Sequence, residues 1–309
     1  MLARIFAIAM NAYREAVRAR VLYGLFGLAL GTAGFSLVIA SLSLHQEARV
    51  VADLGAASIS IYAIVVAIVL GATSLYRELE LKTVFPILSR PLRRYEYLLG
   101  KYLGTLMTLA VFIAIDAGAV MCVLAWQTDQ SPWKIGVTVG LLVAILVVVL
   151  VRAKRTRVFV LLPWSAMFVV CAFVLSSTAG DERRLVVVSS ILTLCEVGII
   201  TAVATLFSSF SSPFLTSILT VLVFFVGRSA DTLANLPRKL FGPLTDAGRV
   251  AAHIFPNLHI YVPARPLLLG HVADVSLAGY VGMAAAHALF YATVLLVVSA
   301  IIFRKRDFQ

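Results

Sequence analysis

Charge is what this sequence has little of. Only 13% of its 309 residues are Asp, Glu, Lys or Arg, whereas soluble domains carry about 25% charged residues. Hydrophobic residues make up 61% of the chain, and the mean hydropathy is +0.99. This composition excludes an ordinary soluble globular protein. The long apolar runs predict an all-α integral membrane protein.

Motifs for catalysis and for nucleotide binding are also missing. The phosphate-binding pattern G-x-x-x-x-G-K-[ST] does not occur, because Gly100 and Lys101 are followed by Tyr102 and lack the leading glycine. Neither H-E-x-x-H nor G-x-S-x-G is present. We therefore predict that the chain is not an enzyme and binds no cofactor. ATP and magnesium, if the function needs them, would be bound by a partner subunit.

Cysteine and histidine give no metal or disulfide pattern. The three cysteines all lie inside apolar runs: Cys122, Cys171 and Cys195. Nothing suggests a disulfide framework or a cysteine-based metal site. Three histidines lie near prolines in one polar segment, at positions 253, 259 and 271, but their spacing fits no standard metal site. The prediction is no metal.

Positive charge is unevenly distributed. The net charge is +11, but no basic stripe lies on a soluble domain, so nucleic-acid binding is not predicted. Most Lys and Arg residues lie in segments that are cytoplasmic if the N-terminus is inside and eight spans follow. This predicts a bacterial inner-membrane protein with both termini in the cytoplasm, and cationic segments that meet anionic lipid. The first apolar run is too long for a cleavable signal and is expected to stay as an anchor.

Eight apolar runs are long enough to be spans. We expect them at about residues 21–43, 57–75, 102–126, 135–151, 158–175, 185–207, 214–227 and 277–303. The cations of RAKRTR, residues 152–157, separate the fourth span from the fifth, since this cluster would be very costly in lipid. Residues 214–227 form the shortest run, and a re-entrant structure is the alternative for them.

Two features near the N-terminus concern packing. Residues 1–20 have a polar face with Arg4, Arg14 and Arg18 and an apolar face that includes Phe6 and Tyr13. This predicts an amphipathic interface helix, and the alternative is an extension of the first span. One stripe of the first span is made of glycines, which predicts close helix packing: Gly24, Gly27, Gly31 and Gly34.

Two acidic residues lie within predicted spans. Asp116 is near the middle of the third span, and Glu196 is near the middle of the sixth. An acid at this depth costs about 2.5–3.5 kcal/mol, so it usually faces protein or a wet cavity. Two interpretations stay open, a substrate or ion path and a hydrogen bond to a hydroxyl of a neighbouring helix.

The most charged segment is YRELELKTVFPILSRPLRRYEYLLGKYLG, residues 76–104. Apolar runs flank it, so it must be an aqueous loop with interfacial ends. Pro86 and Pro91 disfavour a continuous helix from the second span into the third. A second polar segment, residues 228–276, contains five prolines and breaks into short helical pieces.

These segments resemble the permease subunits of the ABC-2 type transporter family, and in particular the branch grouped with multicopper-enzyme maturation and gliding motility. The resemblance is carried by Glu78-Leu79-Glu80, by Ser89-Arg90-Pro91, by Gly100-Lys101-Tyr102, by residues 206–227 and by the terminal IFRKRDF. It covers nearly the whole chain. The family commonly has six spans and this chain has eight apolar runs. The resemblance therefore implies that the fourth and fifth spans are a hairpin inserted into the six-span core.

The resemblance implies a single transmembrane domain over residues 1–309, with a cytoplasmic coupling loop at 76–100 and outer re-entrant helices at 228–276. The coupling helix would dock on a separate ATP-binding subunit of an exporter, and a second permease chain, identical or related, would complete the transporter. The residues that the resemblance places at this coupling surface are Glu78, Glu80, Lys82, Thr83, Pro86, Arg90, Arg93 and Arg94.

Two other functions remain open at this point. One is an ion-coupled secondary carrier that uses Asp116 and Glu196, although no inverted repeat is evident. The other is a membrane scaffold that transmits ATPase cycles without moving a solute. The sequence does not identify the substrate.

Overall fold

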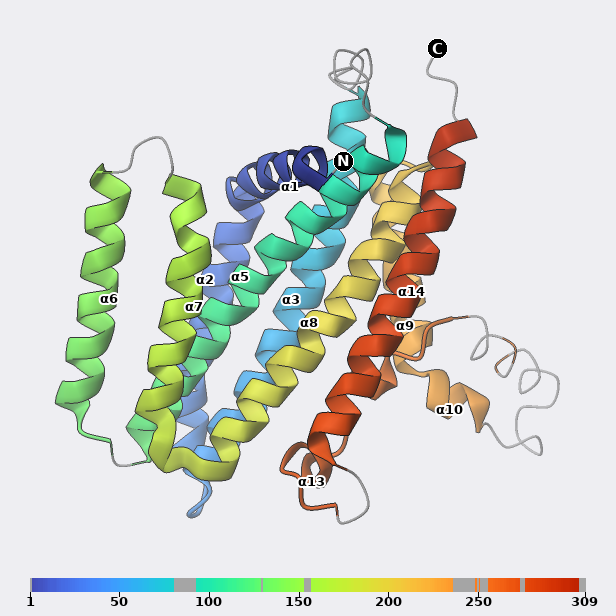
Figure 1. The fold of residues 1–309 in the computed structure, drawn as a ribbon. Coiled ribbons are helices and arrows are strands. Elements are labelled where there is room, and N and C mark those ends of the chain that lie inside the picture. Colours follow the sequence, from blue (N-terminus) through green and yellow to red (C-terminus); the bar gives the residue numbers. More distant parts are fainter. Residues whose placement is uncertain are drawn as a thin grey trace.

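The computed structural model describes residues 2–80, 93–128, 130–152, 157–235, 248, 250, 255–272 and 276–305. Side chains are described for these residues except 75–80, 157, 234 and 305. Within this part of the chain the regular structure is entirely helical, with no strand (Figure 1). The prediction of an all-α membrane protein is confirmed.

Each of the eight predicted spans corresponds to one apolar helix. These helices are α2 (Arg20–Ala40), α3 (Glu47–Glu80), α5 (Arg94–Gln127), α6 (Pro132–Arg152), α7 (Arg157–Leu175), α8 (Gly180–Ser208), α9 (Pro213–Arg228) and α14 (Leu277–Lys305). Six apolar segments among the described residues are long enough to cross a membrane, and one of them, Val158–Ser208, contains both α7 and α8. Helix α9 is shorter than the rest.

A sharp reversal separates α7 from α8. The 3₁₀ turn η1, Ser176–Ala179, ends at Gly180, whose φ is +46°. A residue with a Cβ rarely adopts this backbone conformation. Helices α7 and α8 consequently run in opposite directions (Figure 1). The segment from Val158 to Ser208 is therefore a pair of spans.

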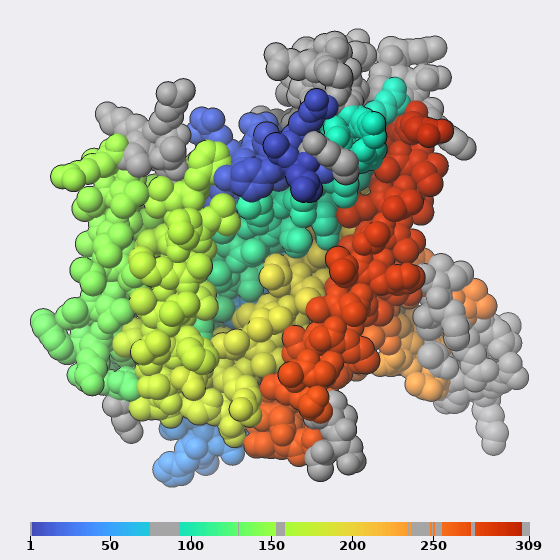
Figure 2. All heavy atoms as spheres, viewed as in Figure 1, coloured from blue at the N-terminus to red at the C-terminus, as the bar shows by residue number. Residues whose placement is uncertain are grey.

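The core lies where α3, α5 and α8 pack together. Its fully buried side chains are mostly aliphatic and include Ile59, Leu109, Leu192 and Ile199. Helix α2 packs against α3, and α14 packs along α8. Helices α6 and α7 form a hairpin in which α6, at the edge of the molecule, contacts mainly α7 (Figure 2). That this hairpin is an insertion stays a prediction.

Helix α1 (Leu2–Val17) lies across one end of the bundle (Figure 1). The helical backbone is interrupted at Ala19, which has an extended conformation, so α1 and α2 are separate helices. Ile5, Ala9 and Tyr13 are buried against protein, whereas Leu2 and Phe6 are 81% and 59% exposed. The amphipathic helix is confirmed, but only part of its apolar face is left for lipid. Its position on a membrane surface stays a prediction.

Short helices connect α9 to α14 in the described residues. They are α10 (Ala230–Ala234), η2 (His259–Tyr261) and α13 (Arg265–Leu268). Such short pieces agree with the pattern expected for residues 228–276, of which most of 236–254 lies outside the described residues. That these helices re-enter a membrane stays a prediction.

Candidate functional site

The predicted coupling residues divide between the end of α3, the start of α5 and the stretch between them. Helix α3 continues beyond the predicted span to Glu80, so Glu78 and Glu80 lie in its last turn. Lys82, Thr83, Pro86 and Arg90 lie outside the described residues. The role of these residues stays a prediction.

Helix α5 begins with its own cap. The backbone N–H of Arg93 donates a hydrogen bond to Oε2 of Glu96 at 3.2 Å, which satisfies a backbone donor at the helix start. The exposed guanidinium of Arg93 donates to the hydroxyl of Tyr95 at 3.2 Å. Arg93 therefore lies at the surface of this end of the bundle, and it is the first described residue after position 80.

Arg94 points to another helix of the same chain. Its Nη1 donates to the carbonyl oxygens of Phe303 at 3.1 Å and Arg304 at 2.8 Å, in the last turns of α14. Carbonyls at a helix C-terminus lack intrahelical partners and carry partial negative charge, so a cation is favoured there. The rings of Tyr97 and Phe303 stack nearby, with centroids 6.5 Å apart. Arg94 thus joins α5 to α14, and a direct contact with a partner protein stays a prediction.

Two glycines of α5 allow α1 to approach closely. A Cβ at Gly104 would lie 2.4 Å from the carbonyl oxygen of Ala9, and a Cβ at Gly100 would lie 2.6 Å from Cβ of Ile8. Both distances are shorter than the 3.0 Å that real Cβ atoms essentially never go below, so only glycine fits at these positions. The sequence analysis missed this G-x-x-x-G pair, because its charged neighbours suggested a loop.

The glycines that the sequence did single out are placed differently. A Cβ on Gly24, Gly27, Gly31 or Gly34 would meet nothing within 4 Å. These residues therefore do not provide close packing among the described residues of this chain. Packing of this glycine face against a second chain stays a prediction.

Two polar contacts also hold α1 in place. Nζ of Lys101 lies 2.9 Å from Oε2 of Glu15, and the Lys101 side chain is 5% exposed. The hydroxyl of Tyr13 donates to the carbonyl oxygen of Val158 in α7 at 3.1 Å, and burial raises the pKa of Tyr13 to about 12. The start of α5 is thereby connected to α1, and α1 to α7.

Glu196 forms an ion pair inside the bundle. It is fully buried in α8, and its Oε1 accepts a hydrogen bond from Nη1 of Arg228 at 2.5 Å. The partner is a cation and not the hydroxyl that one interpretation expected. A role of Glu196 in a substrate or ion path stays a prediction. A 16-residue helix such as α9 extends about 24 Å, less than the hydrocarbon thickness of about 30 Å. The shortness of residues 214–227 was therefore the signal that Arg228 lies beside the middle of α8 and not at its end.

Asp116 differs from Glu196 in having no partner among the residues that the structure describes. Its side chain is fully buried in α5, and neither carboxylate oxygen has a hydrogen-bond partner among the described residues. No ion pair or hydrogen bond joins it to Glu196 in this part of the chain. The two acids therefore do not form one site here.

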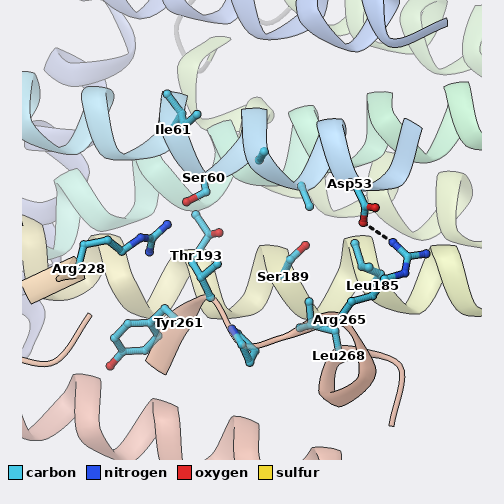
Figure 3. A pocket seen from close by; sticks show the side chains of 14 residues that line it. Asp53, Ser60, Ile61, Leu185, Ser189, Thr193, Arg228, Tyr261, Arg265 and Leu268 are labelled. Carbon is cyan, nitrogen blue, oxygen red and sulfur yellow. Dashed lines mark hydrogen bonds and ion pairs between the residues drawn. The ribbon is translucent and has the colours of Figure 1, made fainter. Parts of the chain in front are cut away.

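A cavity of about 340 Å³ lies between α3, α8 and residues 261–268 (Figure 3). It occupies the halves of α3 and α8 that are farthest from α1. Arg265 closes one end through ion pairs with Asp53 of α3 and Glu182 of α8, and Arg228 lies at the other end. Hydroxyl groups from both helices line the middle: Ser60, Ser189 and Thr193. The sequence analysis missed this site, although Ser189 and Thr193 are four residues apart and share a helix face.

Comparison with known proteins places the chain in a family. The family model described as ABC-2 family transporter protein matches residues 7–308. No curated protein matches the chain.

Proposed function

Because the chain belongs to the ABC-2 family of transporter proteins and is a multi-pass permease, we propose that it works with a separate ATP-binding subunit, which contacts residues 76–100. Closure of that subunit on ATP and Mg²⁺ would move the start of α5, and this movement would drive export of a substrate. The permease itself contributes no catalytic residue in this proposal. A second permease chain completes the transporter.

The observation that carries the proposal is the set of contacts made by the start of α5. Arg94 binds the end of α14, Gly100 and Gly104 pack on α1, and Lys101 pairs with Glu15 of α1. Packed helices move as rigid elements, so a displacement at Arg93 would be passed to α1 and α14 together. Arg94 and Gly100 belong to residues 76–100, and Lys101 and Gly104 follow directly after them in the chain.

The orientation is part of the proposal. Helix α1, the last turn of α3, the first turn of α5 and the C-terminal turn of α14 lie at one end of the bundle (Figure 1). The positive-inside rule assigns this end to the cytoplasm, since it carries most of the short cationic segments. We propose that the membrane is the bacterial inner membrane. Labelling of single cysteines at positions 18 and 131 with a membrane-impermeant maleimide, in intact cells, tests this orientation: only position 131 should react.

The partner is tested by isolating the full chain from native membranes in a mild detergent. Mass spectrometry should identify a co-purifying protein that contains the phosphate-binding pattern absent from this chain. Glu78→Lys should reduce both this association and the ATP hydrolysis of the complex. Recovery of the chain without any such protein would contradict the proposal.

Helix α3 provides a matched control. Glu47→Lys makes the same charge reversal at the opposite end of the same helix. This variant should keep the partner and its ATP hydrolysis. If Glu47→Lys and Glu78→Lys have equal effects, the loss reflects general damage to α3, and the coupling surface is not at residues 76–100.

One observation favours a second candidate function, an ion-coupled carrier. Asp116 is fully buried without a hydrogen-bond partner among the described residues, and such an acid is typical of ion and proton pathways. The purified chain alone in liposomes would then move a solute when only an ion gradient is applied. Transport that requires ATP and the partner would exclude this candidate.

A further inference from the structure

The cavity between α3 and α8 contains hydrogen-bonding groups that the protein does not use. Ser60 is 7% exposed, and its Oγ has no hydrogen-bond partner among the described residues. Figure 3 shows this hydroxyl directed across the cavity toward Thr193 of α8. Thr193 is also buried and makes no side-chain hydrogen bond in this part of the chain. Buried hydroxyls are normally paired, so these two groups indicate a ligand that would pair with them.

Neighbouring hydroxyls on the same helices show what is unusual here. Ser58 donates to the carbonyl oxygen of Gly55 at 2.9 Å, and Ser190 donates to the carbonyl oxygen of Val186 at 2.6 Å. Hydroxyls within helices commonly make such bonds to the preceding turn. Ser60 and Thr193 do not, although nothing in their helical position prevents it. Both residues line the cavity.

The charges around the cavity balance without an added ion. Arg265 is paired with both Asp53 and Glu182, and Arg228 is paired with Glu196. Arg49 of α3 also lies 3.8 Å from Asp53. Three cations therefore meet three acids, and neither an anionic nor a cationic ligand would find an uncompensated charge. A cationic ligand would have to be placed beside the guanidinium groups of Arg228 and Arg265. The electrostatics favour an uncharged polar group.

The apolar lining favours a ligand that is also partly apolar. The ring of Tyr261 forms a wall, while its hydroxyl turns away to the carbonyl oxygen of Ala284 and Nδ1 of His287 in α14 (Figure 3). Ile61 and Val262 line the cavity and are 59% and 44% exposed, so an apolar surface leads out of it. A polar head inside and an apolar tail along these residues would satisfy both parts.

We propose that this cavity binds a small uncharged amphipathic molecule whose head both donates and accepts hydrogen bonds, as a hydroxyl-bearing or amide-bearing lipid-like compound does. Ser60 and Thr193 bind the head from opposite sides. Arg228 donates to its acceptor atoms through N–H groups other than the one that binds Glu196. This binding is a property of the permease chain alone and does not depend on its coupling to an ATP-binding subunit.

The test is equilibrium binding to the full chain in phosphatidylcholine nanodiscs, with empty nanodiscs to subtract partition into lipid. The probe is radiolabelled 1-octanoylglycerol, and octanoate and octylammonium are competitors with the same tail and opposite charges. We expect saturable binding of one probe per chain and weak competition by both ions. Competition by octanoate or octylammonium stronger than that of unlabelled 1-octanoylglycerol would overturn the uncharged class, and absence of saturable binding would overturn the site.

Matched variants locate the binding. Ser60→Ala and Thr193→Val should each raise the dissociation constant by about 3- to 10-fold, as expected for the loss of one hydrogen bond. Ser58→Ala and Ser190→Ala remove buried hydroxyls from the same helices but outside the cavity, and should leave the constant unchanged. Equal effects in the two sets would overturn the assignment.

A further variant fills the space itself. Ala57 lines the cavity from α3, so Ala57→Leu should abolish probe binding while the chain still folds. Thermal unfolding in the same nanodiscs checks folding. Unchanged binding to a folded Ala57→Leu chain would show that the probe binds elsewhere and would overturn the proposal.

Discussion

Arg228 and Glu196 join the end of α9 to the middle of α8 through an ion pair of 2.5 Å. The two partners are unequal, because the Glu196 side chain is fully buried whereas that of Arg228 is 27% exposed. Arg228 also lines the cavity, whereas Glu196 has no other hydrogen-bond partner in the described residues. Because Glu196 is fully buried, removing Arg228 and removing Glu196 should change the free energy of unfolding by different amounts.

We predict that Arg228→Gln lowers the free energy of unfolding by about 3–5 kcal/mol, because it leaves a buried carboxylate without its cation. Glu196→Gln should cost less. The double variant should be more stable than Arg228→Gln alone, since no uncompensated charge remains. Unfolding of the three variants in nanodiscs measures these differences, and additive effects of the two changes would contradict the coupling.

The contact of α1 with α5 gives a second prediction. Gly104→Leu places a side chain where the backbone of α1 lies, and such overpacking typically costs about 1–3 kcal/mol. The result should be faster hydrogen exchange throughout α1, with little change in α8. Gly31→Leu is the control, because a Cβ there meets nothing within 4 Å. Equal exchange of α1 in the two variants would show that the close approach is unimportant.

The glycine face of α2 gives a third prediction, which concerns assembly. If Gly27 and Gly31 pack on a second permease chain, the double change to leucine should lower the fraction of dimer without changing the stability of the isolated chain. Native mass spectrometry of the full chain measures this fraction. An unchanged dimer would place the interface on another helix.

Arg94 gives a fourth prediction. Arg94→Gln removes both hydrogen bonds to the carbonyl oxygens of α14 and should lower the unfolding free energy by about 1–3 kcal/mol. In the complex with the ATP-binding subunit, the movement of α14 should no longer follow that of α5. Spin labels on these two helices measure this movement. Arg93→Gln, at the adjacent exposed position, should leave it intact, and equal loss in both variants would contradict the role of Arg94.

A fifth prediction concerns the two acids that bind Arg265. Glu182 accepts two hydrogen bonds and is 19% exposed, whereas Asp53 is 48% exposed. Glu182→Gln should therefore cost about 1.5–3 kcal/mol, and Asp53→Asn less than about 1 kcal/mol. Added salt should reduce the second effect more than the first. Chemical unfolding at low and high salt measures both, and the reverse order would show that Asp53 holds the contact.

The sequence predicts the helices well, because crossing lipid requires long apolar runs whatever the fold around them. The separation of the fourth span from the fifth followed from the charged cluster at 152–157, and in the structure α6 ends at Arg152 and α7 begins at Arg157. Pairings between helices could not be predicted in this way. The family resemblance placed Arg94 at the coupling surface, and only the structure shows that its guanidinium binds the carbonyl oxygens of Phe303 and Arg304.

The cavity was missed for a related reason. Ser60, Ser189 and Thr193 are common residues in apolar helices, where most hydroxyls bond to their own backbone. What distinguishes Ser60 is that it does not, and the sequence carries no signal of that. The ion pair of Glu196 was closer to being predictable, since α9 has only 16 residues and is therefore too short to carry Arg228 past the middle of the longer α8.

The exposure of α6 bears on which mutations the chain tolerates. It buries only Ile135 and Leu142, and its hydrogen bond from Nε1 of Trp164 goes to the backbone carbonyl oxygen of Leu142 rather than to a side chain. Almost any exchange among valine, leucine, isoleucine and phenylalanine should therefore be neutral along this helix. Its sequence is free to drift among relatives far faster than that of α8, while Trp164 itself stays constrained.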